Sequence, residues 1–565
     1  MSQDIPNIED LMKKTEKTEA FDEKMKEVRL KELEAEAEAS AKSAGLPYVN
    51  LKGFPISPEA LIQIPEDQAE QLKTVCFLFT GPEIRLASVD PADPAVKELL
   101  FQLGERNQAR GGAYKISEES LRIGLKFYAT LPKIATIIKG VKVTDEELSK
   151  FQSELKAYPD IQRILDKASI TDIMTVVMAA SLQFDTSDVH IEAEEQQVVV
   201  RFRVDGVLQE VARLPHGLWK KIVARIKLIS GLKINITDRP QDGRFTIFLK
   251  SGDTDVRVSA IPTTWGESVV MRILKPGSIN VEFPSLGFRP LVEKKLLKEI
   301  AKPHGMVITT GPTGSGKTTT LYAILRKLNT PGVKIVTLED PIEYKLQGIN
   351  QSQIDHTRQY TFANGLRSIL RQDPDIVMVG EIRDLETAET SINAALTGHL
   401  MLSTLHTNDA AGALPRFISM GVKPFLLAPA LNAIIGQRLT RRIHDACKEP
   451  TIIAPEKLES IKKALGDIPP SSGEAVPLPE KWIFYHGKGC DACNHSGYKG
   501  RVGIYEILVM DDTVKNAMSE SLSEYQVREV AKQQGMVTML QDGLLKALDG
   551  LTTVDEVLRI AGETA

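Results

Sequence analysis

The sequence lacks any apolar run of the length that a membrane-spanning helix needs. The longest candidate, Pro424 to Gly436, is shorter than the roughly 20 residues that cross a bilayer. The N-terminus, Met1 to Asp4, is polar and acidic, so we expect no signal peptide. These absences predict a cytoplasmic protein without direct membrane insertion, whose contact with a membrane is made through partners.

The chain also has no excess of positive charge, and its aromatic residues and cysteines are few. Lys and Arg number 70 against 75 Asp and Glu, and aromatic residues make up 5 % of the chain. Neither figure favours nucleic-acid binding by charge or by base stacking. Three of the four cysteines, Cys447, Cys490 and Cys493, stand in short-spaced motifs. In a cytoplasmic protein this spacing indicates a metal site rather than disulfides.

The length of 565 residues is enough for several domains. Residues from about Asp10 to Lys42 are dense in Glu and Lys and have no wide apolar stripe. This segment therefore predicts a solvated helix or a mobile tether. Asp145 to Lys156 is also charged and reads as a linker. Further on, Arg201 and Arg203 fall on one face of a predicted strand. The pattern alone fits a solvated face and a functional face equally well.

A glycine-rich turn lies between a β-branched run, Val307 to Thr310, and a helix-like segment, Leu321 to Leu325. The turn matches G-x-x-x-x-G-K-[ST]. Glycines let backbone N–H groups surround a phosphate at a helix N-terminus, the lysine reaches the β- and γ-phosphates, and the threonine hydroxyl ligates Mg²⁺. The pattern predicts an ATP and Mg²⁺ site made by Gly311, Pro312, Thr313, Gly314, Ser315, Gly316, Lys317, Thr318 and Thr319, with Thr318 as the Mg²⁺ ligand.

Acidic residues follow two more buried strands downstream of this turn. Val333 to Leu338 ends in Glu339 and, four residues later, Glu343; Asp375 to Gly380 ends in Glu381. Alternating strands and helices predict a parallel α/β sheet, and acids at the carboxyl ends of its strands can lie beside Mg²⁺. Histidines flank a further strand, and we expect His399 and His406 to serve on the phosphate side of the site.

Taken in order, these motifs resemble those of the secretion ATPase superfamily that powers type II secretion and type IV pilus assembly. The resemblance covers about residues 45 to 565. Besides the phosphate loop, it rests on an acidic box (Thr337 to Tyr344), a Walker B variant (Val379 to Asp384), a histidine box (Thr397 to Asn408) and two middle-domain motifs (Ser187 to Glu192 and Pro240 to Arg244).

The resemblance implies a homohexamer of RecA-like ATPase domains, each preceded by a middle domain that moves relative to it. The expected fold class is α/β and multidomain, with two smaller α/β or α+β domains before the parallel-sheet core and a zinc element after it. The expected parts are a charged helical tether (1–44), an N-terminal module (45–150), a PAS-like middle domain (159–285), the RecA-like domain (286–440) and a zinc element with a C-terminal helical subdomain (441–565).

The resemblance also implies residue roles. Glu343 looks like the residue that polarises the attacking water, with Glu339 as the less favoured choice. Glu381 resembles the Walker B glutamate near Mg²⁺, and His399 and His406 resemble γ-phosphate sensors. The middle-domain arginines that close on the nucleotide are matched by Arg244 and Arg257, with Arg272 as a further candidate.

Two departures from the family pattern bear on ligands. Some relatives bind cyclic di-GMP before the N-terminal module, but the stretch Ala39 to Ala44 lacks their motif, so we do not expect that ligand. Relatives also carry four cysteines in the zinc element, whereas this chain has a histidine in the first place. A Cys₃His set binds zinc, so we expect zinc on His444, Cys447, Cys490 and Cys493. His486 or His495 could replace His444, and the alternative is a vestigial element with free thiols.

We expect an ATPase motor that drives type IV pilus assembly through an inner-membrane platform protein, or else a type II secretion ATPase. The N-terminal domain and the cysteine element favour an assembly or export motor over a retraction motor. The competing hypotheses are a nucleic-acid translocase and a nucleotide-gated scaffold without turnover.

Overall fold

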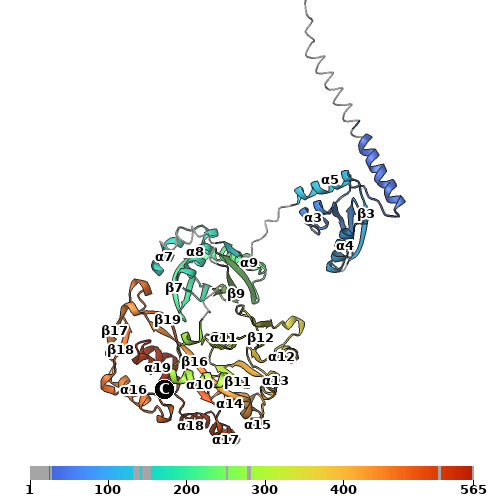
Figure 1. Ribbon diagram of the computed structural model, residues 1–565. Coiled ribbons are helices and arrows are strands. Elements are labelled where there is room, and N and C mark those ends of the chain that lie inside the picture. The colour runs from blue at the N-terminus through green and yellow to red at the C-terminus, as the bar shows by residue number, and fades with distance from the viewer. Residues whose placement is uncertain are drawn as a thin grey trace, which may run out of the picture. The chain divides into compact units, whose positions relative to one another are not determined.

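The computed structural model describes residue 25 and residues 28–107, 109–131, 140–142, 154–249, 252–275, 281–518 and 523–562. The chain divides into two compact units, residues 1–137 and 138–565 (Figure 1). Most of the predicted linker, residues 145–153, and most of the N-terminal part of the charged segment lie outside the described residues. Among the residues that are described, no helix is both long and apolar enough to cross a membrane.

The first unit is a small α/β module around a three-stranded sheet in the order β1-β2-β3. β1 and β2 are antiparallel, while β3 runs parallel to β2, with α4 as the crossover. Its elements are α2 (Pro58–Leu61), α3 (Glu66–Gln71), β1 (Thr74–Phe79), β2 (Glu83–Ser88), α4 (Pro94–Asn107), β3 (Arg110–Lys115) and α5 (Glu118–Lys126).

The described part of the charged segment forms a helix over residues 28–43, and this helix packs on the first unit. The Glu34 carboxylate accepts hydrogen bonds from Tyr48, Ser117 and Ser120, which places a negative charge at the N-terminus of α5. Ala41 is fully buried. This helix therefore makes specific contacts with the module, which its solvated composition did not predict.

The second unit begins with a seven-stranded sheet in the order β4-β8-β9-β10-β5-β6-β7, whose helices α7, α8 and α9 pack with it in one apolar core. Most neighbouring strands are antiparallel. The elements are β4 (Gly140–Lys142), α7 (Tyr158–Leu165), α8 (Ile170–Gln183), β5 (Asp188–Ala193), β6 (Gln197–Val204), β7 (Val207–Pro215), α9 (Trp219–Ser230), β8 (Gln241–Phe248), β9 (Thr254–Thr263) and β10 (Gly266–Leu274).

The second sheet confirms the predicted parallel α/β core. Its order is β13-β12-β14-β15-β11-β16-β19, and every neighbouring pair is parallel except the last. The central strands are buried on both faces because helices cover both. The strands are β11 (Gly305–Thr310), β12 (Ile335–Glu339), β13 (Asn350–Gln353), β14 (Ile376–Val379), β15 (Leu400–Leu405), β16 (Leu431–Ile443) and β19 (Tyr498–Val509). The helices are α10 (Pro290–Ile300), α11 (Lys317–Leu328), α12 (Phe362–Leu370), α13 (Leu385–Leu396), α14 (Ala413–Ser419) and α15 (Pro424–Ala430).

The described C-terminal part of the chain packs a two-stranded antiparallel sheet and five α-helices beside this sheet. These elements are β17 (Lys448–Thr451), α16 (Pro455–Gly466), β18 (Phe484–Gly487), α17 (Asp512–Met518), α18 (Glu524–Gln534), α19 (Met539–Leu548) and α20 (Val554–Ala561). Ile461 and Leu465 of α16 share an apolar cluster with residues of α19 and α20. The excursion between the two cysteine motifs is therefore anchored by packing as well.

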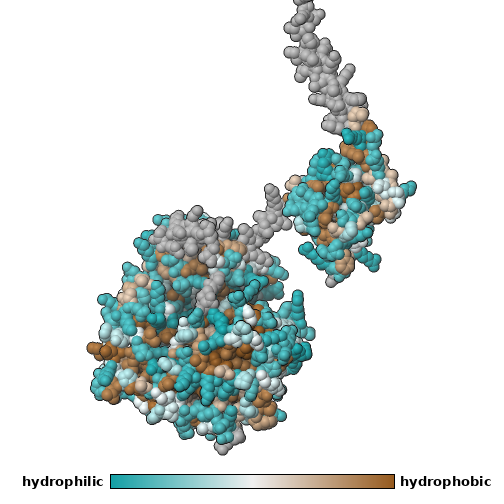
Figure 2. Space-filling model, in the orientation of Figure 1, coloured by the Kyte–Doolittle hydropathy of each residue, from teal (hydrophilic) through white to brown (hydrophobic). Residues whose placement is uncertain are grey.

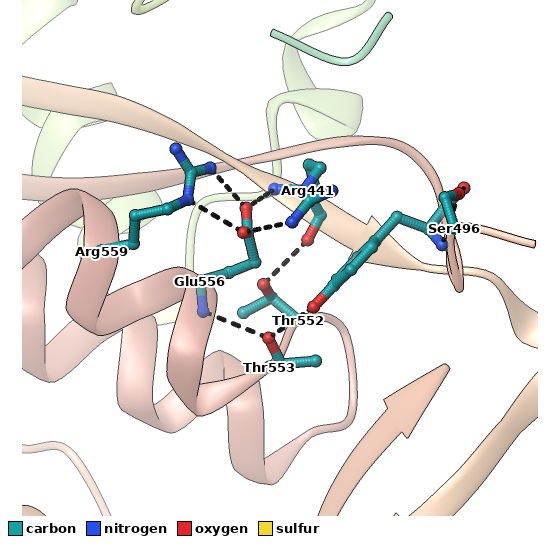
Figure 3. A network of polar contacts seen from close by, with 7 residues as sticks. Arg441, Ser496, Thr552, Thr553, Glu556 and Arg559 are labelled. Carbon is teal, nitrogen blue, oxygen red and sulfur yellow. Dashed lines mark hydrogen bonds and ion pairs between the residues drawn. The ribbon is translucent and has the colours of Figure 1, made fainter. Parts of the chain in front are cut away.

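A buried carboxylate fixes α20 against β16. In Figure 3 the Glu556 carboxylate lies between the guanidinium groups of Arg441 and Arg559, and both ion pairs are 2.7 Å long. Burial alone would raise the pKa of Glu556. Hydrogen bonds from the two arginines outweigh burial, so the pKa is lowered to about 2. The Arg441 guanidinium also lies 4.0 Å from the ring centroid of Tyr498, at the start of β19. Charged pairing thus joins the last helix to both strands of the sheet edge.

On the face that Figure 2 shows, hydrophilic residues predominate over the described parts of both units, with apolar patches between them. Exposed apolar side chains such as Phe425, Ile452 and Trp265 are far apart in the sequence.

Candidate functional site

The predicted phosphate loop, acids and one histidine gather at one edge of the second sheet. Strands β12, β14, β15 and β11 are neighbours and parallel, so their carboxyl ends lie at the same edge. The loop follows β11, Glu339 ends β12, Glu381 follows β14 and His406 follows β15.

Backbone shape and a neighbouring strand hold the phosphate loop open. Gly311, Gly314 and Gly316 have φ values of 147°, 81° and 89°, which favour glycine. A Cβ on Gly311 would lie 2.4 Å from the carbonyl oxygen of Gln437 on β16. The Gln437 amide donates a 2.8 Å hydrogen bond to the carbonyl of Ser315. The loop is thus braced by β16, a contact that no local motif reveals.

Lys317 is the first residue of α11, and its ammonium group turns back over the loop. It donates to the carbonyl oxygens of Gly311, at 2.7 Å, and Pro312, at 3.1 Å. Burial lowers the pKa of Lys317, and the charge of Glu381 opposes that shift. Thr318 occupies the next helical position and is partly exposed. This arrangement is suited to holding phosphate oxygens at a helix N-terminus.

The two candidate bases after β12 have different surroundings. Glu339 is buried, and its oxygens accept hydrogen bonds from the Tyr322 hydroxyl, the Thr337 hydroxyl at 2.5 Å and the Gln351 amide at 3.1 Å. Glu343 is 31 % exposed and pairs with Arg257. Three donors thus engage the buried Glu339, whereas the partly exposed Glu343 is paired with Arg257.

Glu381 lies between a histidine and an arginine. Its oxygens are 3.4 Å from Nε2 of His406 and 2.6 Å from the guanidinium of Arg383. Burial, followed by the nearby positive charge of Lys317, lowers the pKa of His406, while Glu381 opposes the shift. The lowered pKa favours the neutral imidazole, which has one donor nitrogen and one acceptor nitrogen.

His399 lies at the other end of β15, away from the phosphate loop. Its carbonyl accepts the N–H of Gly305 at the start of β11, and its Nδ1 lies 3.1 Å from the carbonyl of Ala394. Since β15 has six residues at about 3.3 Å each, roughly 16–20 Å separate His399 from the edge that carries His406. The structure therefore does not bring His399 to the phosphate loop of its own chain.

The middle-domain arginines form a row across the first sheet of this unit. Arg244 on β8 and Arg272 on β10 are both directly opposite Arg257 on β9, so all three project from the same face. Arg257 reaches Glu343 at 3.0 Å and the carbonyl of Ile342 at 3.1 Å. Arg257 therefore already touches the second sheet's acidic box.

The other arginines of this sheet differ in their partners. Arg272 is held by Asp188 at 2.9 Å, which also faces Arg203 at 3.4 Å. Arg201 is paired with Glu192 and Glu194, so neither arginine of β6 is simply solvated. Arg244 is exposed, and within the described residues it makes no ion pair or side-chain hydrogen bond.

A cavity of about 1350 Å³ opens beside the phosphate loop, within the second unit. Gly316, Thr319 and Thr320 line one side of it, and Tyr505 and Arg441 line another. Its volume exceeds the usual size of a small-molecule pocket. The cavity thus reaches the end of the phosphate loop and the first turn of α11.

The Cys₃His group comes together at the start of the C-terminal region. Its ligand atoms, on His444, Cys447, Cys490 and Cys493, all lie within 4.8 Å of one another. Four of the separations are 3.3, 3.7, 3.7 and 3.9 Å. A tetrahedral zinc ion with Zn–S of about 2.3 Å and Zn–N of about 2.0–2.1 Å has ligand-to-ligand edges of about 3.5–3.8 Å. The residues present therefore fit zinc.

The alternative histidines have other partners. His486 faces Glu449 at 3.3 Å, and His495 faces Asp491 at 3.1 Å. Burial raises the pKa of the Cys493 thiol, but N–H groups of Cys490 and Gly497 that donate to its sulfur leave the pKa lowered overall. Such donors stabilise a thiolate, and Nδ1 of His444 lies 3.3 Å from the Cys490 sulfur and 3.7 Å from the Cys447 sulfur.

Sequence reasoning missed the residues that shape the site from a distance. Gln437, Tyr322 and Gln351 brace the loop and Glu339. Each carries an ordinary polar side chain outside any motif, so the sequence held no signal for them.

The fold and this edge define a P-loop nucleotide-hydrolysing protein. The model of the type II/IV secretion system protein family matches residues 163–559, and the MshEN domain model matches residues 44–120. The chain belongs to the type II/IV secretion system protein family, and it is an ATPase.

Relatives match over most of the chain. The chain is 39 % identical to the type IV pilus assembly ATPase PilB of Myxococcus xanthus, over 93 % of this chain and 90 % of that protein. It is 40 % identical to the type II secretion system ATPase E of Vibrio cholerae, over 91 % and 98 %. The X-ray structure of the Yersinia pseudotuberculosis ATPase DotB matches at 18 % identity, with a TM-score of 0.50, over 69 % of this chain and 93 % of that one, and shows the fold alone.

Proposed function

We propose that the protein is a hexameric motor that hydrolyses ATP to drive type IV pilus assembly. The observation that carries this is the meeting of Lys317, Glu381 and the Arg257–Glu343 pair at one sheet edge. The M. xanthus relative, named for pilus assembly, matches nearly the full length of both chains. The alternative is a type II secretion ATPase, favoured by the similar match to the V. cholerae relative.

The proposed chemistry assigns one task to each residue. Lys317 exchanges the Gly311 and Pro312 carbonyls for phosphate oxygens. Glu343 leaves Arg257 and orients the attacking water, while Arg257 turns to the charge that develops on the phosphoryl group. Mg²⁺, held by the Thr318 hydroxyl and near Glu381, would neutralise phosphate charge. His406 senses the γ-phosphate beside Glu381.

Three assignments made from the sequence have less support than those above, or none. Arg244 closes on the nucleotide from the same face as Arg257, since it is exposed and directly opposite it in the sheet. His399 has no support as a sensor within its own chain. We also propose the division into tether, N-terminal module, middle domain, RecA-like domain and C-terminal element. Two strands cross its predicted bounds, since β4 joins the middle sheet and β19 joins the parallel sheet.

We further propose that zinc binds to His444, Cys447, Cys490 and Cys493. Zinc binding would add to the folding free energy of the segment that joins β16 to β19. The proposed partners are five copies of this chain and an inner-membrane platform protein, which would place the motor in the cytoplasm at the inner face of the membrane.

The test combines one substitution with one deletion. Glu343→Gln should bind ATP and fail to hydrolyse it, because the phosphate loop stays intact while water activation is lost. Turnover close to wild type would move the role to Glu339.

ATPase activity stimulated by DNA would favour a translocase. Deleting the gene should abolish surface pili and leave protein export intact; the reverse result would establish the secretion alternative.

A further inference from the structure

A buried glutamate on β19 lies where the catalytic edge meets the C-terminal helices. Glu506 is 5 % exposed. One oxygen of its carboxylate accepts the N–H of Ala410 at 2.7 Å, and the other accepts the N–H of Met539 at 3.1 Å. Ala410 belongs to the loop after β15, and Met539 is the first residue of α19. The carboxylate thus ties two elements together, one through each oxygen.

The opposite strand leaves room for this contact. Gly436 on β16 is the cross-strand partner of Glu506. A Cβ on Gly436 would lie 2.8 Å from Cγ and Oε1 of Glu506 and 2.9 Å from the Ala410 nitrogen. The φ of Gly436 is not positive, so space rather than backbone conformation explains the glycine.

The loop that Glu506 holds also carries His406 and contacts the residue before the phosphate loop. Thr407 donates its N–H to the Thr310 hydroxyl at 3.0 Å, and their two hydroxyls are 2.6 Å apart. His406 itself faces Glu381 at 3.4 Å. The loop is therefore fixed at Thr407 by the phosphate-loop strand and at Ala410 by Glu506.

We propose that Glu506 is a positioning residue for ATP hydrolysis. By holding Ala410 it sets where the His406 loop lies against Glu381, and by holding Met539 it makes that position depend on the C-terminal helices. This inference rests on hydrolysis at the Glu343 and Glu381 edge, as proposed above. A force or partner acting on α19 would then change turnover without touching the nucleotide.

The charges around Glu506 make the contact sensitive to pH. Burial, and then the charge of Asp409 in the same loop, raise the pKa of Glu506 to about 7, while the two N–H donors and Arg528 on α18 oppose that shift. Arg528 is itself paired with Asp409 and with Glu524. An ionised carboxylate accepts both N–H groups, whereas a protonated one has a donor on one oxygen. The contact should weaken as pH falls through about 7.

The test is Glu506→Gln in the full-length hexamer. The amide keeps the size but offers one acceptor, so one backbone N–H loses its partner. We expect kcat to fall roughly ten- to hundredfold, with KM for ATP changed less than about twofold, since a net loss of 1.4 kcal/mol is tenfold. In the wild type we expect kcat to rise with pH near 7, and this rise should be absent from the pH profile of Glu506→Gln. Glu524→Gln, an exposed acid beside the same Arg528, is the matched control and should behave as wild type.

Several outcomes would overturn the inference. These are wild-type kcat in Glu506→Gln, loss of kcat only together with loss of the hexamer, or a pH dependence near 7 that survives in Glu506→Gln and so belongs to another group. If Glu506→Gln does not fold, Gly436→Ala displaces the same carboxylate and must lower kcat at constant KM. No ATPase activity in the wild type would instead refute the proposed function.

Discussion

Replacing Arg257 with alanine separates a structural contact from transition-state stabilisation. Arg257 lies on β9 and makes an ion pair with Glu343 and a hydrogen bond to the carbonyl of Ile342. If Arg257 only holds the two sheets together, the substitution removes the free energy of these two contacts and nothing more. If it stabilises charge on the transferred phosphoryl group, the loss appears in kcat.

The structure limits what the contacts alone can contribute. The side chains of Arg257 and Glu343 are 32 % and 31 % exposed, so the pair is worth about 0.2–1 kcal/mol. The hydrogen bond to Ile342 adds about 0.5–1.5 kcal/mol. Together they amount to about 0.7–2.5 kcal/mol, which corresponds to roughly three- to seventyfold. An arginine finger is worth about 10³–10⁵ in rate. A loss of kcat above about 100-fold therefore exceeds the ground-state contacts.

The assay is steady-state ATPase activity of Arg257→Ala, with hexamer assembly measured by light scattering. We expect kcat to fall by about 10³ or more with assembly retained. Arg203→Ala is the matched control, because Arg203 lies in the same row but pairs with Asp188, away from Glu343. Unchanged turnover in Arg257→Ala, or an equal loss in Arg203→Ala, would refute the reasoning.

Three more predictions follow from particular contacts. Protein purified without added zinc should contain about one zinc per chain, and the content should fall sharply in Cys490→Ser and His444→Ala; wild-type protein without zinc would remove the site. Gly311→Ala should abolish ATP binding, measured with a fluorescent analogue, because its Cβ would meet the Gln437 carbonyl at 2.4 Å; retained affinity would contradict this. Glu556→Gln should lower the free energy of unfolding at pH 7 by about 3 kcal/mol, since the folded pKa of about 2 lies below the unfolded value. This stability is present above about pH 4.5 and is lost as pH falls toward 2, so the difference in denaturant midpoints should shrink in acid.

Sequence reasoning reached the parallel core and the phosphate loop because both depend on local patterns. A buried strand, glycines at positive φ and a helix-starting lysine are neighbours in the chain, and each constrains the backbone by itself. Acids that follow parallel strands must share one sheet edge with this loop, whatever the strand order. The two cysteine motifs are likewise visible as spacings. These features could be located before any side chain was placed.

The tertiary structure decided what depends on contacts between distant segments. Glu339 and Glu343 follow the same predicted strand, and the resemblance alone favoured Glu343. In the structure, donors from α11 and β13 engage Glu339, while Arg257, 86 residues earlier in the chain, engages Glu343. His399 and His406 flank the same strand, yet only its carboxyl end meets the phosphate loop. Which histidine completes the cysteine cluster, and which glutamate holds the His406 loop, follow from strand pairing between β16 and β19. Periodicity along the chain identifies strands and their faces, but register and packing between sheets determine which side chains meet.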